Sequence, residues 1–95
     1  MIRHIVFFSA KDPNDIEAIR AGLLKLGQIP HQSKFEVSLN RKSDPVSGVI
    51  DVVVYAEFAN DAALAAYRAH PIYVETTRNV KPLRELRFSA DVEAD

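Results

Sequence analysis

The sequence predicts an α+β fold in which a four-stranded antiparallel sheet carries its helices on one face. Alternation of apolar and polar side chains marks four segments as strands, and apolar residues three and four positions apart mark two segments as helices. These elements follow in the order β-α-β-β-α-β, which is the order of the ferredoxin-like split βαβ arrangement. The chain of 95 residues is therefore predicted to be a single domain, residues 1–95.

The composition argues against several classes of protein. The chain is 47% hydrophobic and 26% charged with a net charge of -1, so it offers no basic surface for nucleic acid. It contains no cysteine, which excludes disulfides and thiolate metal sites. No segment has the apolar run that a targeting sequence or a membrane span requires. We expect a cytoplasmic protein without nucleic-acid or membrane partners.

The first predicted strand, Ile2–Ser9, is apolar on both of its faces. Alternation places His4 on one face and Phe7 on the other. Large apolar residues accompany each of them, with Ile2, Val6 and Phe8 on the first face and Ile5 on the second. A strand of this kind is covered on both sides.

The first predicted helix follows at once. Asp12 before Pro13 is an N-terminal cap followed by a proline at the first helical position. The helix then carries one apolar stripe, made by Ile16, Ile19, Leu23 and Leu26. Gly27 is predicted to end it in a left-handed conformation.

The middle of the chain predicts a hairpin. Lys34–Asn40 alternates as a half-buried strand, residues 41–48 are polar and form the loop, and Val49–Phe58 is the strongest strand signal in the sequence. Asp51 and Glu57 are the only charged residues of the predicted strand Val49–Phe58, and we expect both at its solvent edge.

A second helix is predicted from a cap at Asn60 through Ala69, with an interruption and restart at Pro71. The last strand, Arg84–Val92, then alternates apolar residues with a polar set made by Arg87, Ser89 and Asp91. Residues 92–95 are expected to fray.

The helices can cover only one face of the sheet, although two strands are apolar on both. Leaving the other face in water would expose a large patch of the kind that marks an interface. That patch would contain either Ile5, Phe7, Val49 and Val53 or their counterparts on the opposite face. We therefore expect a homodimer that forms through the open sheet face.

Three parts of the sequence carry a resemblance to a known family. They are the opening run around His4, the strand end Glu57-Phe58 with the following Asn60-Asp61-Ala62, and the run from Ala66 to Pro71 that contains Tyr67 and His70. Together they resemble the stress-responsive A/B barrel domain (Dabb) family of the dimeric α-β barrel superfamily. The resemblance implies a dimeric α+β barrel with a pocket between sheet and helices, lined by the early histidine and the second helix.

The same resemblance implies residue roles. In a similar polyketide cyclase, which performs an aldol cyclisation, a histidine and a tyrosine act on the substrate; His4 and Tyr67 match them as candidate catalytic residues. His70 matches the first histidine of a His-Pro-x-His signature, whereas Tyr73 and Asp51 stand where that cyclase has other histidines. These three are candidate ligand-binding residues. A phenol with a pKa near 10 removes a proton poorly at neutral pH, which argues against an identical mechanism.

Each candidate also has a structural explanation. His4 is either a pocket base or a buried histidine held by a hydrogen bond, and Tyr67 either holds a substrate oxygen or packs in the core. His70 either lines the pocket or caps the restarted helix, and Tyr73 is either a donor or a space-filling side chain.

Two functions remain open from the sequence. One is a binding protein for a small acidic or carbonyl-containing ligand. The other is an enzyme, either of the cyclase type or a cofactor-free or haem monooxygenase of the related dimeric barrel type. Three separated histidines form no metal-binding pattern, so we expect no metal and no cofactor.

Overall fold

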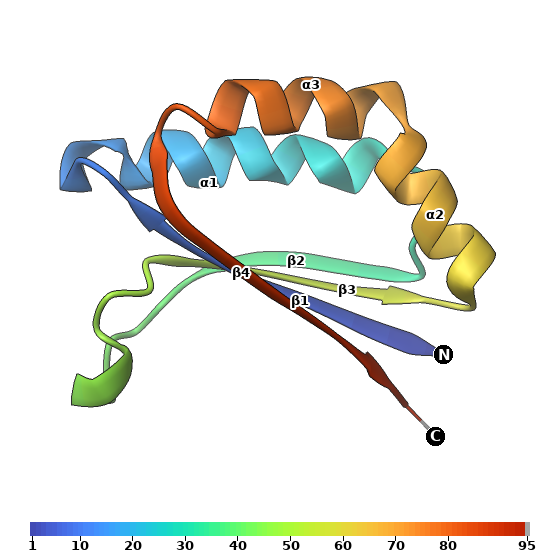
Figure 1. Ribbon diagram of the computed structural model, residues 1–95, viewed down its shortest axis with the longest axis horizontal. Helices are drawn as coiled ribbons and strands as arrows, with labels where there is room; N and C mark the ends of the chain where they lie inside the picture. The colour runs from blue at the N-terminus through green and yellow to red at the C-terminus, as the bar shows by residue number, and fades with distance from the viewer. Residues whose placement is uncertain (95) are drawn as a thin grey trace.

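Four antiparallel strands form one sheet in the order β2-β3-β1-β4 in the computed structural model, which describes residues 1–94. Within that range three α-helices cover one face of the sheet (Figure 1). The strands and α-helices are β1 Ile2–Ala10, α1 Ile16–Leu24, β2 Lys34–Leu39, β3 Val52–Phe58, α2 Asp61–Ala69, α3 Pro71–Val80 and β4 Arg84–Glu93. Short 3-10 helices occupy Pro13–Asp15, Lys25–Gln28 and Pro45–Ser47. The predicted ferredoxin-like fold is confirmed.

The register of β1 decides which side chains face the helices. His4 lies opposite Ala56 of β3 and Asp91 of β4, and Phe7 lies opposite Val53 and Phe88. Directly opposed residues of antiparallel strands point to the same face. The face with His4 is therefore covered by the helices, and the face with Phe7 is open.

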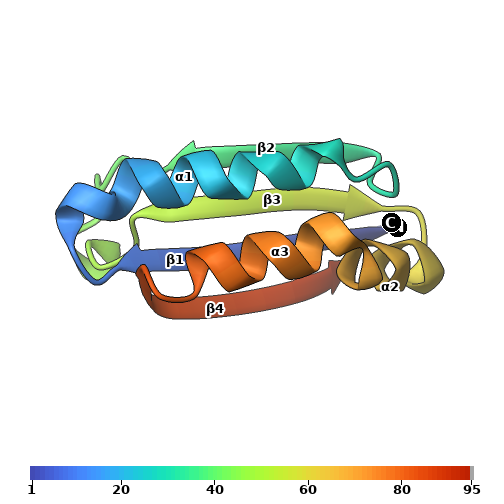
Figure 2. The ribbon, with the colours of Figure 1, turned by 90° about the horizontal axis from the view of Figure 1, so that it is seen from above.

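The helices divide the covered face between them. Seen from above, α1 runs over β2 and β3, and α3 runs over β1 and β4 (Figure 2). The predicted apolar stripe of the first helix is confirmed, because Ile19 and Leu23 of α1 are buried against the sheet together with Leu26 of the following turn. One contiguous core results between the two layers.

The cap at Asn60 is confirmed, but the predicted end of the first helix is wrong. The Asn60 side chain accepts a hydrogen bond from the backbone N–H of Ala63 at 2.9 Å. Gly27 does not adopt a left-handed conformation, and no glycine of residues 1–94 has a positive φ. Instead the helix tightens into the 3-10 turn Lys25–Gln28, where the Leu26 carbonyl accepts from the Ile29 N–H at 3.1 Å and the Gln32 side chain at 3.0 Å.

The third strand begins at Val52, three residues later than predicted. Asn40 holds the preceding loop, since its side-chain amide donates to the Ile50 carbonyl at 2.7 Å and to the Ser47 carbonyl at 3.1 Å. The Asp51 N–H donates to the Phe8 carbonyl at 2.8 Å. Val49 consequently lies in the loop rather than on the open sheet face.

The C-terminal end is also better ordered than predicted. β4 continues to Glu93, and the Ala94 N–H donates to the Met1 carbonyl at 2.8 Å. The Met1 ammonium donates in turn to the Ala94 carbonyl at 3.3 Å. The expected fraying is therefore wrong for residues 92–94, and Asp95 lies outside the described residues.

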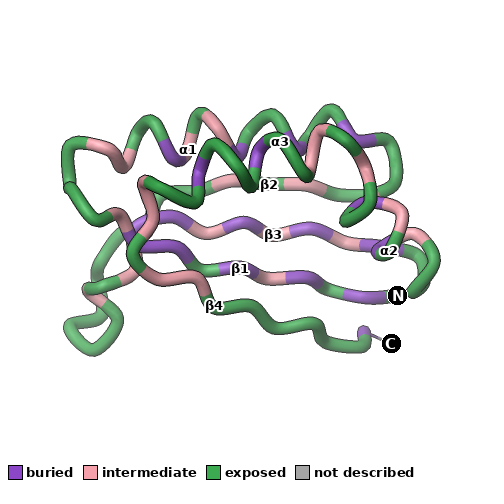
Figure 3. Tube along the Cα trace, turned by 45° about the horizontal axis from the view of Figure 1, so that its top comes forward, coloured by how far each residue is buried: buried purple, intermediate pink, exposed green. Residues whose placement is uncertain are grey.

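Burial follows the alternation of the central strands. In Figure 3 buried positions recur along β1 and β3, whereas β4 is exposed over most of its length. The open face carries Phe7, Phe88 and Val92 at 36%, 57% and 47% exposure. In the part of the chain that the structure describes, no helix is long and apolar enough to cross a membrane.

Candidate ligand-binding site

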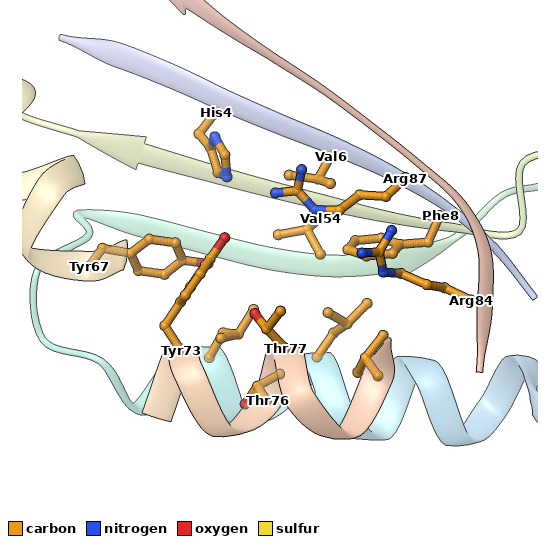
Figure 4. A pocket seen from close by; sticks show the side chains of 13 residues that line it. His4, Val6, Phe8, Val54, Tyr67, Tyr73, Thr76, Thr77, Arg84 and Arg87 are labelled. Atoms are coloured by element: carbon orange, nitrogen blue, oxygen red, sulfur yellow. The ribbon is translucent and has the colours of Figure 1, made fainter. Parts of the chain in front are cut away.

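A cavity lies between the covered face of the sheet and α3 (Figure 4). Its empty volume, with the open mouth included, is about 400 Å³. The lining residues are His4, Val6, Phe8, Leu23, Leu26, Val54, Tyr67, Tyr73, Thr76, Thr77, Val80, Arg84 and Arg87.

His4 is a buried titratable group of this cavity. Its position on the covered face of β1 leaves it 1% exposed, and its Nδ1 lies 2.5 Å from Oδ1 of Asp91 on the neighbouring strand. An ionised carboxylate only accepts hydrogen bonds, so Nδ1 donates. Among residues 1–94, Nε2 of His4 has no hydrogen-bond partner, and protein atoms do not enclose it completely. In the neutral ring Nε2 is therefore an acceptor available to the cavity.

Asp91 is held on both of its oxygens. Oδ2 accepts a hydrogen bond from the Nη2 of Arg68 on α2 at 3.0 Å, while Oδ1 binds His4. Burial raises the pKa of the Asp91 carboxyl, but the hydrogen bond and charge of His4, followed by those of Arg68, outweigh that effect and hold the pKa below its usual value. Asp91 is therefore an anion that fixes the orientation of the His4 ring.

Tyr67 closes the other side of the cavity. Its ring packs edge-on against Phe58, Tyr73 and His4, with centroids 4.9, 5.2 and 6.1 Å away. Burial and the neighbouring Tyr73 raise the pKa of the Tyr67 phenol well above its usual value, against the opposing charges of Arg87 and Arg68. The hydroxyl stays protonated at neutral pH and can donate a hydrogen bond, but it cannot act as a base.

Helix α3 supplies a further polar edge. Tyr73, Thr76, Thr77 and Val80 fall on one side of the helix at spacings of three and four residues, which is why all of them reach the cavity. Figure 4 shows the His4 ring directed toward the two phenols. An imidazole nitrogen and two phenol oxygens thus gather at one end of a mostly apolar cavity.

Two residues predicted as ligand-binding do not line the cavity. His70 caps α3, because its Nδ1 accepts from the Ile72 N–H at 3.1 Å. Its ring packs against His31, with the centroids 6.1 Å apart. The structural explanation of His70 is therefore the one that the geometry supports.

Asp51 lies at the far end of the sheet, and the expectation of a solvent-edge charge is wrong. It is 8% exposed, and its Oδ2 accepts from the Ala10 N–H at 2.9 Å while Oδ1 pairs with Lys42 Nζ at 2.7 Å. The carboxylate joins the end of β1 to the β2–β3 loop. Among residues 1–94 no group of three or more His, Cys, Asp or Glu side chains is arranged to hold a metal ion.

Sequence reasoning missed Asp91, the partner of His4, together with Arg68 and the cavity residue Arg87. Asp91 and Arg87 stood out only as the polar side of the last strand, and Arg68 only as part of a helix. The available signal was the alternation itself. The apolar side of that strand faces away from the helices. Its polar side therefore faces them, on the same sheet face as His4 of the neighbouring strand β1.

The fold and the cavity define a ferredoxin-like α+β protein with a polar-ended pocket. The family model of the stress responsive A/B barrel domain matches residues 2–94. The chain therefore belongs to the stress-responsive A/B barrel domain family, as its resemblance indicated. Among curated proteins no sequence matches it.

Solved structures share the fold over nearly the whole chain. A Dabb family protein with a ferredoxin-like fold from Mesorhizobium loti is 26% identical, with a TM-score of 0.80 over 98% of this chain and 95% of that chain. A dimeric ferredoxin-like protein of unknown function from Thermobifida fusca is 24% identical, with a TM-score of 0.83 over 98% and 90%. A protein named as an antibiotic biosynthesis monooxygenase is 17% identical, with a TM-score of 0.80 over 100% and 99%.

The state of Asp91 predicts a pH dependence of stability. Because the pKa of its carboxyl is lower in the folded state than the unfolded value near 3.9, its stabilisation is full above that value and is lost as the pH falls toward the folded pKa. Asp91→Asn should therefore lower the free energy of unfolding at neutral pH, and its difference from the wild type should shrink on acidification.

Urea unfolding over a pH series measures this difference. Glu93→Gln, an exposed carboxylate on the same strand, is the control and should show little effect. An Asp91→Asn difference that is the same at about pH 7 and about pH 3 would contradict the assigned state.

Proposed function

We propose that this protein is a homodimer whose protomers each bind a small carbonyl-containing or acidic ligand in the cavity. The observation that carries the ligand site is the convergence of the His4 imidazole with the hydroxyl-bearing rings of Tyr67 and Tyr73 in one cavity. Pockets that combine apolar walls with a few convergent polar groups are typical small-molecule sites. His4 and Tyr67 are the residues proposed to contact the reacting or recognised carbonyl, and Tyr73 is proposed to line the site.

The open sheet face supports the dimer. Phe7 lies opposite Phe88 there and Ile5 opposite Ala90, so apolar side chains of β1 and β4 form a continuous exposed area. Such areas on small domains are usually covered by a partner. The similar structure from Thermobifida fusca is itself described as dimeric.

A second candidate function, proton transfer, is favoured by the contact between His4 and Asp91. A carboxylate that holds Nδ1–H orients the ring and leaves Nε2 as a base, which is the arrangement used in many general-base sites. Nε2 would take a proton from the carbon next to a ligand carbonyl, and the Tyr67 hydroxyl would donate to the enolate oxygen. Asp91 would act through His4 as a positioning residue.

The dimer predicts a mass of twice the protomer in light scattering at micromolar concentration. Phe7→Asp places a charge in the proposed interface, so this variant should be monomeric. Leu24→Asp changes an apolar residue of similar exposure on α1 and should remain a dimer. A monomeric wild type would refute the proposed assembly.

The ligand site predicts a role for the Tyr67 hydroxyl. Methyl hexyl ketone should perturb the NMR signals of the Val6 and Val54 methyl groups, which line the cavity. Loss of one hydrogen bond in Tyr67→Phe should weaken its binding by roughly fivefold. Tyr55→Phe removes a hydroxyl that binds Glu57 on the open face, so it should leave the affinity unchanged. Equal weakening by both variants would argue against the site.

Proton transfer predicts exchange of ligand hydrogens with solvent. In heavy water the wild-type protein should replace the hydrogens next to the carbonyl of methyl hexyl ketone by deuterium, as followed by proton NMR. His4→Gln should slow this exchange at least ~100-fold, because the base is removed. Asp91→Asn should slow it too and shift its pH profile, because the ring is no longer held with Nδ1 as the donor. Exchange at the wild-type rate in His4→Gln would exclude His4 as the base.

A further inference from the structure

Two arginines lie in the cavity without a partner of their own. Arg84 and Arg87 both line it, and neither takes part in an ion pair or side-chain hydrogen bond among residues 1–94. Both are partly buried rather than exposed. No aspartate or glutamate lines the same cavity. The site therefore presents unneutralised positive charge beside apolar walls.

A bulge in the sheet brings the two arginines to one face. Residues three positions apart on a regular strand point to opposite faces. Here Phe8 pairs with Arg87 and Ala10 pairs with Arg84, so β4 contains one residue more than β1 between these pairs. The Ser9 hydroxyl accepts a hydrogen bond from the Leu86 N–H at 3.0 Å and stabilises this irregularity. Bulges commonly redirect side chains at functional sites, and this one directs Arg84 and Arg87 into the same cavity.

The cavity thus has two chemically different ends. The neutral donors Tyr67 and Tyr73 and the His4 ring lie at one end, and Arg84 lies at the other, beyond Phe8. His4 and Phe8 are four residues apart on β1, which is about 13 Å along a strand. Val6 and Val54 form the apolar wall between them, and Figure 4 shows Arg87 extending along it toward His4.

We infer that the ligand is an organic carboxylate, whose acid group binds between Arg84 and Arg87 and whose apolar body lies against Val6 and Val54. This inference rests on the proposed function of the cavity as a ligand site and identifies the class of ligand. Guanidinium groups bind carboxylates with paired, charge-assisted hydrogen bonds. The sheet side of the cavity between the two ends, formed by Val6 and Val54, is apolar and fits an apolar body.

The test compares acids with their neutral counterparts. Octanoate and phenylpropanoate are titrated beside octanamide and phenylpropanamide, and methyl NMR locates each probe. Val6 and Val54 report on the cavity, and Ile5 and Val53 on the open sheet face. At least one acid should shift Val6 and Val54 and bind at least tenfold more tightly than its amide.

Variants assign that preference to the two arginines. Arg84→Gln and Arg87→Gln should each weaken binding of the acid roughly tenfold and leave binding of its amide unchanged. Arg78→Gln, which removes an exposed arginine of α3 outside the cavity, should have no effect.

Several results would overturn the inference. The inference fails if an amide binds as tightly as its acid, or if neither acid binds. It also fails if the acids shift only the methyl signals of Ile5 and Val53, or if inorganic phosphate competes for the site as well as octanoate does. If the amides or methyl hexyl ketone still bind at Val54 in a Tyr67-dependent manner, the proposed carbonyl site stands and only the carboxylate assignment fails. If no probe binds in the cavity, both fail.

Discussion

The pairing of β1 with the edge strand β4 is the interaction on which the rest of the structure depends. It places Asp91 opposite His4 on the covered face and Phe88 opposite Phe7 on the open face. The first contact orients the only buried imidazole of residues 1–94, and the second forms part of the apolar area proposed as a dimer interface. A shift of one residue in this register would exchange the two faces and remove both features together.

Burying the polar groups of the cavity lowers the stability of so small a domain, and hydrogen bonds from neighbouring side chains offset this loss. A buried imidazole without a partner would be destabilising, but Asp91 satisfies its Nδ1 and Arg68 satisfies the second Asp91 oxygen. Tyr67 contributes its ring to the core through Phe58 and leaves its hydroxyl beside the cavity. The apolar part of each aromatic therefore stabilises the fold, while its polar part remains available to a ligand.

Alternation within strands was enough to predict the fold and the faces of the sheet. It placed His4 with Ile2, Val6 and Phe8, and these four side chains are all buried. The same reasoning placed Asp91 on the polar side of the last strand, but its contact with His4 depends also on register and on which strands become neighbours.

Other differences arose from single side chains acting outside the periodic pattern. Asn40 folds the hairpin loop and delays the start of β3, which moves Val49 off the sheet and buries Asp51. The bulge in β4 opposite Ser9 places Arg84 and Arg87 on one face, although simple alternation assigns them to opposite faces. Such features depend on specific hydrogen bonds, and a one-dimensional pattern of polarity does not contain them.

The position of β4 also links the cavity to the open face. Asp91 stands between Ala90 and Val92 on the same strand, so its carboxylate lies on the covered face against His4 while both neighbours point to the proposed interface. As an edge strand β4 has only one hydrogen-bonded neighbour in the protomer, namely β1. A second copy packed on the open face would restrict its motion and, with it, the position of the carboxylate that holds His4. Assembly and the geometry of the site would then share one structural element.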